Sequence, residues 1–427
     1  MKITILTIGS RGDVQPYVAL GIGLKKAGHQ VKIATHENFE EFVKERGLEF
    51  FPLRGNAIEL LESKFGMAML ESEINPVKTL YSMLKLIDPM FEELITDMWS
   101  ASQGSEALIC STLSLPGFCI AEKLKIPSIF AILQPMIRNT THSSLFFPDI
   151  PNIPVIKPIY NWYSFILTEQ VLWQNTKKMT NKMRKELMEL PPLPFWGIFS
   201  RFYQKKNPIP TILGYSPHVI QREAEWMEWM QITGYWFLDK QENWQPPADL
   251  TSFLESGDPP VYIGFGSMRT RNPEETAETV IKALKKSKKR GILMKGWGGL
   301  NSSKINDDEI FFIDSVPHDW LFPKMAAVIH HGGAGTTSAG LRAGVPGIIV
   351  HFFGDQIFWG KKIHELKVGS KPIPIKKLNS DNLSAAINQV TSDNEIKYHA
   401  KKLSEKINSE NGVDNAVMMI NKHIKAR

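Results

Sequence analysis

Residues 327–337 read AVIHHGGAGTT, and this segment limits the possible folds more than any other part of the chain. The β-branched start predicts a short strand that ends at His330. Three glycines in the next five positions allow positive φ and a close approach of the backbone to a ligand. A helix is predicted to begin near Thr336, so its first N–H groups and its positive dipole end face the loop. The segment therefore predicts a phosphate site, to which His331 adds a donor. The alternative is a tight turn with a buried histidine.

Short apolar runs alternate with helical patterns in the first part of the chain. Strands are predicted over 3–8, 31–34 and 48–53, and helices over 17–28 and 39–46. This spacing is typical of βαβ units and a parallel sheet. Ligands bind outside the carboxyl ends of such strands, so the loop over 9–16 is a second candidate site.

The same order returns after residue 250. Helices are predicted over 273–286 and 337–343. The predicted strands of this part are 260–265, 291–294, 310–313, 327–330 and 347–350. The chain is therefore predicted to be α/β, with two Rossmann-like domains. A length of 427 residues agrees, at roughly 150 residues per domain.

We place the first domain at 1–237, a polar linker with prolines at 238–250 and the second domain at 251–405. An amphipathic segment follows at 406–427. Within the first domain, residues 135–215 are rich in proline and aromatic residues. They predict loops and helices that wall a pocket, or else the ordinary core of a helical subdomain.

Composition excludes several classes. With 50 Lys and Arg against 44 Asp and Glu, the net charge of +6 permits contact with an anionic surface but does not require nucleic acid. Two cysteines exclude a disulfide scaffold. Neither a secretory signal nor a run of about 20 apolar residues is found, so we expect a cytoplasmic protein.

Common phosphate and metal motifs are missing. The sequence has no G-x-x-x-x-G-K-[ST], and the first strand leads into GSRG rather than G-x-G-x-x-G. Neither H-E-x-x-H nor an aspartate pair spaced D-x-D after a strand occurs, so we expect no metal.

Three separated motifs carry a family resemblance: GSRGDVQP at 9–16, VPHDW at 316–320 and FFGDQ at 352–356. Together with the glycine segment they resemble family 1 glycosyltransferases of the GT-B fold, and most closely the sterol glucosyltransferases. Glucosyltransferases of glycopeptide aglycones are also similar. The resemblance is weak over 55–240.

The resemblance implies two Rossmann-like domains facing across a cleft, the first for the acceptor and the second for the nucleotide sugar. The last helix would cross back to the first domain; a free amphipathic tail is the alternative. Because the chain starts on its first strand, we expect a bacterial-type catalytic core.

The resemblance also implies roles for individual residues. Asp355 and Gln356 would bind the sugar hydroxyls, since a carboxylate and an amide together accept and donate. Singly, that pair could instead cap a helix, and 316–322 could be a buried turn. The implied donor-binding residues are Ser10, Arg11, Ser267, Val316, His318, His331, Ala334, Gly335, Thr336, Asp355 and Gln356.

Asp13 is the expected catalytic base. It follows the first strand, where many family members have a histidine, and a carboxylate there could take the proton of the acceptor hydroxyl. Its ordinary pKa of about 3.9 would have to rise for this role. The alternative is that Asp13 only caps a helix beginning at 14–17.

The expected reaction moves a hexosyl group, with inversion, from a UDP-sugar, first of all UDP-glucose, to a hydroxyl of a lipophilic acceptor. A sterol-like alcohol is the first choice and a polyketide or peptide aglycone the second. A UDP-sugar epimerase or phosphorylase and a non-catalytic lipid- or nucleotide-binding protein are the rivals. We expect no cofactor beyond the nucleotide sugar, a monomer or weak dimer, and brief contact with the inner membrane face.

Overall fold

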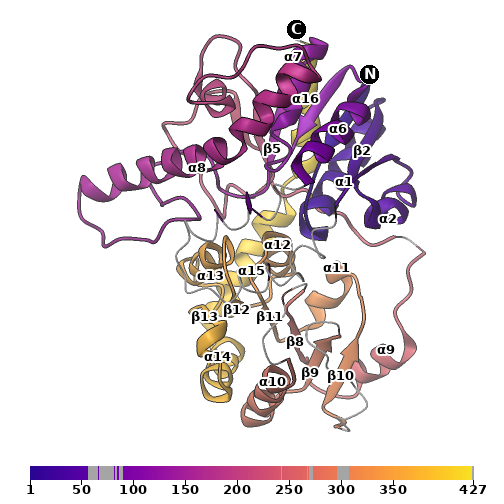
Figure 1. Ribbon diagram of the computed structural model, residues 1–427. Helices are drawn as coiled ribbons and strands as arrows, with labels where there is room; N and C mark the ends of the chain where they lie inside the picture. Colours follow the sequence, from indigo (N-terminus) through magenta and orange to yellow (C-terminus); the bar gives the residue numbers. More distant parts are fainter. Residues whose placement is uncertain are drawn as a thin grey trace. The chain divides into compact units, whose positions relative to one another are not determined.

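The structure is a computed structural model, and it describes residues 1–55, 66, 81, 84–85, 90–241, 243–266, 268, 273–295 and 307–425. The chain divides into two compact units (Figure 1). The first contains Met1–Leu238 and Asn411–Arg427, and the second contains Asp239–Glu410.

A parallel sheet forms the centre of the first unit, in the order β3-β2-β1-β4-β5-β6-β7 for the described strands. Its inner strands are buried on both faces, which explains their continuous apolar runs. The strands are β1 (Lys2–Leu6), β2 (Gln30–His36), β3 (Glu49–Leu53), β4 (Ala107–Cys110), β5 (Ser128–Ile132), β6 (Thr211–Leu213) and β7 (Met230–Ile232).

Helices pack against this sheet. The longest is α8, which comes from the proline-rich region and has 31 residues. Cys110 and Cys119 are both buried and unbridged. The helices of this unit are α1 (Arg11–Lys26), α2 (Glu40–Lys44), α6 (Phe91–Ser102), α7 (Pro116–Leu124), α8 (Ile156–Glu186) and α16 (Gly412–Lys425), with short 3-10 turns at Glu37–Phe39 and Ile198–Tyr203.

The first helix differs from the sequence prediction. Helix α1 begins at Arg11, six residues before the predicted start at Tyr17. The glycines and Pro16 suggest a loop, but Pro16, the sixth residue of α1, removes only one helical hydrogen bond, and the bonds between Ser10 and Asp13 stabilise the first turn. Most of the predicted loop over 9–16 is therefore the first turns of α1.

Helix α16 returns to the first unit and packs on α1. A side-chain carbon placed on Gly23 would lie 2.4 Å from Val413 Cγ1, so glycine permits this close approach. Ala416, Ile420 and Ile424 are buried in the same core as the β1 and β2 side chains. The predicted return of the last helix is confirmed.

The second unit has its own parallel sheet, in the order β10-β9-β8-β11-β12-β13 for the described strands. Three of these strands have the bounds predicted from the sequence. The strands are β8 (Val261–Gly264), β9 (Gly291–Met294), β10 (Ile310–Ile313), β11 (Ala327–His330), β12 (Gly347–His351) and β13 (Ile373–Pro374). Both predicted Rossmann-like sheets are therefore confirmed.

Helices connect the strands of the second unit. The first of them, α9, begins within the segment predicted as a linker, and α12 begins two residues before the expected Thr336. The helices are α9 (Ala248–Glu255), α10 (Pro273–Ser287), α11 (His318–Leu321), α12 (Ala334–Ala343), α13 (Gln356–Glu365), α14 (Ser380–Ser392) and α15 (Asn394–Asn408), with 3-10 turns at Phe322–Lys324 and Ile375–Lys377. Among all described residues of both units, no helix combines the length and apolar character needed to span a bilayer.

Candidate functional site

The predicted phosphate site lies at the reversal point of the second sheet. Strand β8 has β9 on one side and β11 on the other, so chain connections leave in opposite directions there. In open α/β sheets ligands bind outside the carboxyl ends of the strands at such a point. The segments that follow β8, β11 and β12 all begin at this edge because the strands are parallel.

The glycine segment turns sharply from β11 into α12. Gly332 has φ +97°, and its N–H donates to His330 Nδ1 at 3.1 Å. The first helical bond joins Thr337 N to the oxygen of Gly333, the N-cap, at 2.9 Å. The N–H groups of residues 334–336, in the first turn, have no acceptor inside the helix. The predicted donors Ala334, Gly335 and Thr336 are thus the first three helical residues, an arrangement suited to an anion.

His331 is held between two glycines. A side-chain carbon on Gly333 would lie 2.5 Å from His331 Nε2, and one on Gly266 would lie 3.1 Å from Cε1. Burial lowers the pKa of His331 to about 4, so the imidazole is neutral at pH 7. Its Nδ1 is buried with no hydrogen-bond partner among the described residues. A neutral imidazole has one donor and one acceptor nitrogen, so His331 has hydrogen-bonding capacity left for a ligand.

Asp355 and Gln356 lie beside this loop at the start of α13. A side-chain carbon on Gly332 would lie 3.1 Å from the backbone oxygen of Gln356. The Asp355 carboxylate accepts from Trp359 Nε1 at 3.1 Å and makes no cap bond to backbone, although Asp355 is the N-cap of α13. The structure therefore brings the predicted sugar residues and the predicted phosphate loop together.

The side chain of Gln356 is more constrained than expected. It is buried, and its Oε1 accepts from the N–H groups of Phe352 and Phe353 at 2.8 and 3.3 Å. Its Nε2 donates to the sulfur of Met268 at 3.5 Å, a weak interaction. In this structure Gln356 shapes the loop, and only its amide nitrogen is available to exchange partners.

Val316 and His318 lie near the same sheet but pack inward. Val316 belongs to the core cluster of the second unit. The His318 ring stacks on Phe322 at a centroid distance of 4.2 Å and meets the edge of Tyr262 at 6.0 Å. Ser267, predicted to contact phosphate, lies outside the described residues.

The other three predicted residues belong to the first unit. The Asp13 carboxylate accepts from both the N–H and the hydroxyl of Ser10, each at 3.0 Å. Ser10 is the N-cap of α1 and Asp13 is three residues further, so the interpretation of Asp13 as N-cap is wrong. Arg11 is exposed, donates to Gln15 at 3.1 Å and lies 4.8 Å over the Phe42 ring.

The surroundings of Asp13 favour a stronger base than free aspartate. Burial raises the pKa of Asp13, although hydrogen bonds from Ser10 and Gln134 oppose the shift. Gln134 Nε2 is 3.4 Å from Asp13 Oδ1. Gln134, two residues after β5, was not found from the sequence. Its position just past the carboxyl end of a buried strand is the signal that could have identified it.

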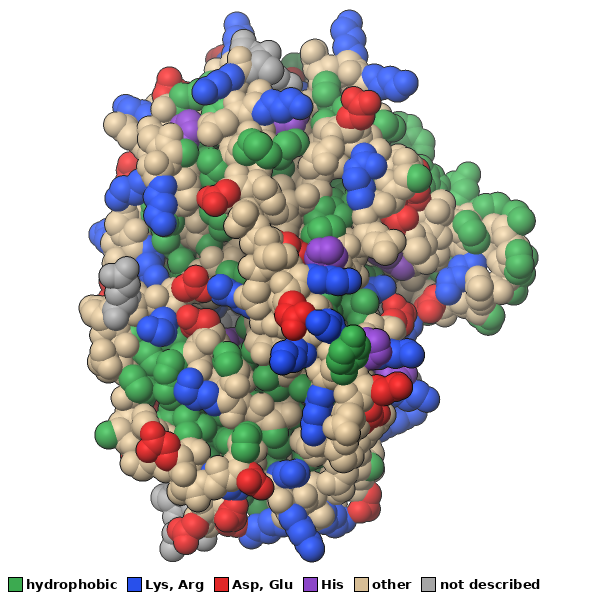
Figure 2. Space-filling model, turned by 180° about the vertical axis from the view of Figure 1, so that it is seen from behind, with side chains coloured by type: hydrophobic (Ala, Val, Ile, Leu, Met, Phe, Trp, Pro, Cys, Tyr) green, Lys and Arg blue, Asp and Glu red, His purple; other side chains and the backbone are tan. Residues whose placement is uncertain are grey.

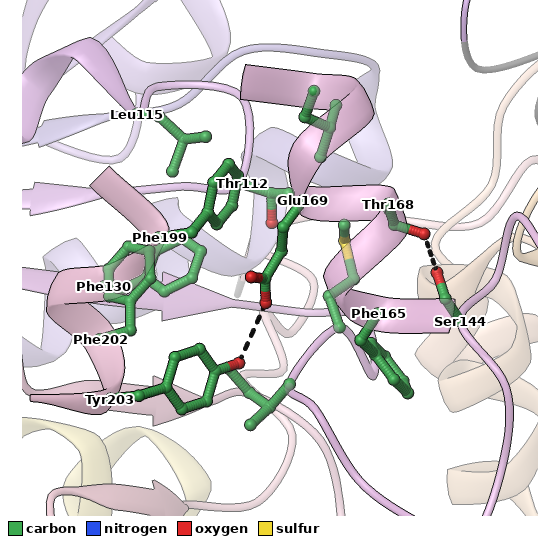
Figure 3. A pocket seen from close by; sticks show the side chains of 13 residues that line it. Thr112, Leu115, Phe130, Ser144, Phe165, Thr168, Glu169, Phe199, Phe202 and Tyr203 are labelled. Atoms are coloured by element: carbon green, nitrogen blue, oxygen red, sulfur yellow. Dashed lines mark hydrogen bonds between the residues drawn. The ribbon is translucent and has the colours of Figure 1, made fainter. Parts of the chain in front are cut away.

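A pocket in the first unit lies between α8 and the segments after β4 and β5 (Figure 3). Aromatic rings and aliphatic side chains form most of its wall. Ser144 and Thr168 share a hydrogen bond of 2.6 Å at one side. The lining residues are Thr112, Leu115, Phe130, Met136, Ile137, Ser144, Phe165, Thr168, Glu169, Leu172, Phe199, Phe202 and Tyr203.

Polar groups in this pocket are joined in one cluster. The Arg138 guanidinium donates from Nε to Glu169 Oε1 at 2.9 Å and Oε2 at 3.1 Å, and lies 4.1 Å over the Tyr203 ring. The Tyr203 hydroxyl donates to Glu169 at 3.3 Å (Figure 3). Burial raises the pKa of Glu169 against the opposing effect of Arg138. The cluster places the Glu169 carboxylate and the Tyr203 hydroxyl in a mostly apolar wall.

Two family models match separate parts of the chain. Residues 3–143 match the glycosyltransferase family 28 N-terminal domain. Residues 301–420 match the erythromycin biosynthesis protein CIII-like C-terminal domain. These matches contain the Asp13 region and the glycine loop, respectively.

Two relatives from Arabidopsis thaliana align with almost the whole chain. Sterol 3-beta-glucosyltransferase UGT80A2 is 38% identical over 433 residues, covering 99% of this chain and 66% of the relative. Sterol 3-beta-glucosyltransferase UGT80B1 is 36% identical over 431 residues, covering 99% and 68%. The chain thus spans about two thirds of the plant relatives, and 33% of a relative from Pichia angusta.

A solved structure supports the fold. Glycosyltransferase SsfS6 from Streptomyces sp. SF2575, complexed with thymidine diphosphate, matches with a TM-score of 0.66 at 17% identity, covering 99% of both chains. At that identity the likeness concerns the fold, which confirms the predicted GT-B class. The chain belongs to the glycosyltransferase family that includes the sterol 3-beta-glucosyltransferases.

Proposed function

We propose that the chain transfers a hexosyl group, glucose before other sugars, from a UDP-sugar to the hydroxyl of a sterol-like alcohol. The observation that carries the proposal is the identity of 36–38% with sterol 3-beta-glucosyltransferases over 99% of the chain. The chain's own anion site and partly buried carboxylate supply the groups that such a transfer needs.

In this proposal the second unit binds the nucleotide sugar. The first N–H groups of α12 bind the diphosphate, and the helix dipole favours the charge that grows as it leaves. His331, neutral because of its low pKa, adds one uncharged hydrogen bond to a phosphate oxygen. Val316 and His318 border the base, and Ser267 adds a further donor to phosphate.

The sugar hydroxyls are assigned to Asp355 and Gln356. Trp359 Nε1 donates to the Asp355 carboxylate and orients it, and in the proposal this carboxylate accepts from a sugar hydroxyl. Gln356 keeps the loop in shape through its Oε1 and offers its Nε2 to the sugar in exchange for the weak bond to Met268.

The first unit supplies the acceptor and the base. Asp13, with its pKa raised by burial, takes the proton of the acceptor hydroxyl as that oxygen attacks the anomeric carbon. A single displacement inverts the configuration at this carbon. Ser10 orients the Asp13 carboxylate, and Arg11 lies one residue into the same helix, where its charge attracts the donor phosphates. The apolar wall beneath α8 offers the kind of surface that a polycyclic alcohol contacts, but its cavity of about 30 Å³ has to widen to admit one.

The test is acceptor-dependent release of UDP from UDP-glucose, with sterols, polyketide aglycones and glycopeptide aglycones as acceptors. The proposal expects sterols to give the fastest release and a β-configured product from an α-configured donor. If only aglycones give UDP release, the acceptor is an aglycone and not a sterol. Conversion of the UDP-sugar without acceptor would favour an epimerase, and binding without turnover a non-catalytic protein.

Two variants separate the roles in this assay. Asp355→Asn should raise KM for UDP-glucose while UDP itself still binds, because the carboxylate is assigned to the sugar and the α12 loop to the diphosphate. Asp393→Asn is the matched control, since Asp393 is also a helix N-cap in the second unit, at α15. If the two variants bind UDP-glucose equally well, the sugar assignment of Asp355 is wrong.

A further inference from the structure

Helix α8 exposes a row of large apolar side chains to solvent. Ile156, Ile159, Tyr163 and Leu167 are each between 52% and 59% exposed. Their spacing of three, four and four residues places them on one face of the helix. Ile153 and Val155, just before the helix, are also exposed. Isolated exposed apolar residues are ordinary, but a continuous row of them marks an interaction surface.

The row continues onto two aromatic residues from the following segment. Gln174, on the same helical face as Ile156, donates to the backbone oxygen of Phe195 at 3.1 Å. Lys177 lies 5.9 Å over the Phe195 ring, and the rings of Phe195 and Trp196 are 5.3 Å apart. Both rings are more than half exposed. We define the α8 face as Ile153, Val155, Ile156, Ile159, Tyr163, Leu167, Phe195 and Trp196.

The opposite side of the same helix lines the pocket. Phe165, Thr168, Glu169 and Leu172 line it, about half a turn away from the exposed row (Figure 3). Figure 2 shows hydrophobic side chains gathered on a projecting lobe at the place that α8 occupies in Figure 1 after the half turn. One helix therefore has the pocket on one side and apolar surface in contact with water on the other.

Basic residues outnumber acidic ones in the sequence of this region. Residues 151–208 contain nine Lys and Arg but only three Asp and Glu, an excess of six. The whole chain has the same excess, with 50 against 44. Four of the nine pair with acidic residues outside the segment, since Lys157 contacts Asp149, Lys182 contacts Glu92, and Arg184 and Arg201 contact Glu122. Lys177, Lys178 and Lys185 share the helical face of the exposed row, which itself contains no acidic residue.

We propose that the α8 face docks on the surface of an anionic lipid bilayer. Tyr and Trp side chains suit the boundary between headgroups and acyl chains, where one part of the ring system is apolar and another wet. Apolar side chains enter that boundary while nearby lysines attract anionic headgroups. The inference rests on the proposed function in one respect: a sterol-like acceptor resides in the bilayer, and docking places the helix that bears the pocket at its source.

Sedimentation with lipid vesicles tests the docking directly. We expect the native chain to sediment with vesicles of phosphatidylcholine mixed with phosphatidylserine, more weakly with phosphatidylcholine alone, and less as salt rises. The double variant Tyr163→Ser, Leu167→Ser should bind at least about tenfold more weakly, since each large apolar side chain contributes roughly that factor when buried. Trp196→Ser should act in the same direction.

Matched controls lie on other helices. Tyr398→Ser on α15 and Met418→Ser on α16 remove side chains that are 59% and 62% exposed, close to the exposure of the α8 face. They should bind vesicles like the native chain. Because all these positions are exposed, circular dichroism should show every variant folded.

Three results would overturn the proposal. One is equal sedimentation of the native chain and the α8 variants. Another is that the control variants weaken vesicle binding as much as the α8 variants do, which would show non-specific hydrophobic adsorption. The third is a concentration-dependent dimer, dissociated by the α8 variants, with no vesicle binding; the face would then be an interface between two copies.

Turnover separates this proposal from the proposed function. The α8 double variant should lose UDP release with sterol held in vesicles but keep it with sterol in detergent micelles. Suppose instead that the double variant loses turnover with both forms of sterol while the native chain still binds vesicles. Tyr163 and Leu167 would then belong to the acceptor site, and the docking role would be contradicted. No turnover by the native chain in either form would reject the proposed function, and the vesicle result would still stand.

Discussion

The Asp13 carboxylate lies directly against the backbone of Gly9. A side-chain carbon on Gly9 would come within 2.5 Å of Asp13 Oδ2, and Gly9 has φ +136°, where residues with side chains are strained. The last glycine before α1 thus makes room for the proposed base. Ser10, between the two, donates to the same oxygen twice.

Gly9→Ala should therefore damage catalysis more than folding alone explains. Gly28→Ala is the matched control, because Gly28 has φ +88° and no atom within 4 Å of the added carbon. Both variants should lose about 1–3 kcal/mol of unfolding free energy from backbone strain. Only Gly9→Ala should also lower kcat, since it displaces the Asp13 carboxylate. Equal kcat in the two variants would contradict this role of Gly9.

The pH dependence of turnover should report Asp13. The base must be ionised, and burial raises the pKa of Asp13, so kcat/KM should fall with decreasing pH at a value above the ordinary pKa of about 3.9. Asp13→Asn should lower kcat by about 100-fold or more and remove this acid limb. An acid limb that persists unchanged in Asp13→Asn would assign the titration to another group.

Stability should fall in mild acid partly because of His331. Its pKa is about 4 when folded and about 6.5 when unfolded, so the unfolded chain binds the extra proton between these values. The free energy of unfolding should thus decrease as pH drops from 6.5 toward 4. Urea unfolding at several pH values should show a shallower decrease for His331→Gln, but an unchanged one for His399→Gln on α15. An identical decrease in His331→Gln would mean that His331 is not kept neutral by the fold.

The Glu169 and Arg138 pair should matter for stability because it is largely buried. Glu169→Gln leaves the guanidinium without its counterion and should cost about 3 kcal/mol of unfolding free energy. Glu405→Gln breaks an exposed pair with Lys402 on α15 and should have no measurable effect. Denaturant titration compares them, and similar values for both variants would show that the buried pair is dispensable.

Local patterns were enough to predict much of the fold. Short apolar runs predicted β9, β10 and β11 with their observed bounds, because buried parallel strands are continuously apolar. The glycine segment predicted a strand, a turn and a helix in the right order. The start of α1 was missed, because Gly12 and Pro16 weaken the helical pattern while the bonds between Ser10 and Asp13 stabilise its first turn.

Contacts between distant segments could not be predicted in this way. Arg138 and Glu169 are 31 residues apart and Tyr203 is 34 beyond Glu169, and no spacing rule joins them. Similarly, Gln134 reaches Asp13 across 121 residues only because β1 and β5 belong to one parallel sheet. The engagement of the Gln356 amide by Phe352 and Phe353 also depends on the three-dimensional course of one loop.

The return of α16 has a consequence for how the chain folds during its synthesis. Ile420 and Ile424 complete the core that contains Ile3 and Ile33, yet the ribosome makes them only after the entire second unit. At about 5–20 residues per second, the roughly 170 residues between take many seconds to emerge. Throughout that time the apolar side of α1 lacks the α16 side chains that cover it in the folded protein. The nascent first unit should therefore be a target for chaperones until the last helix leaves the exit tunnel.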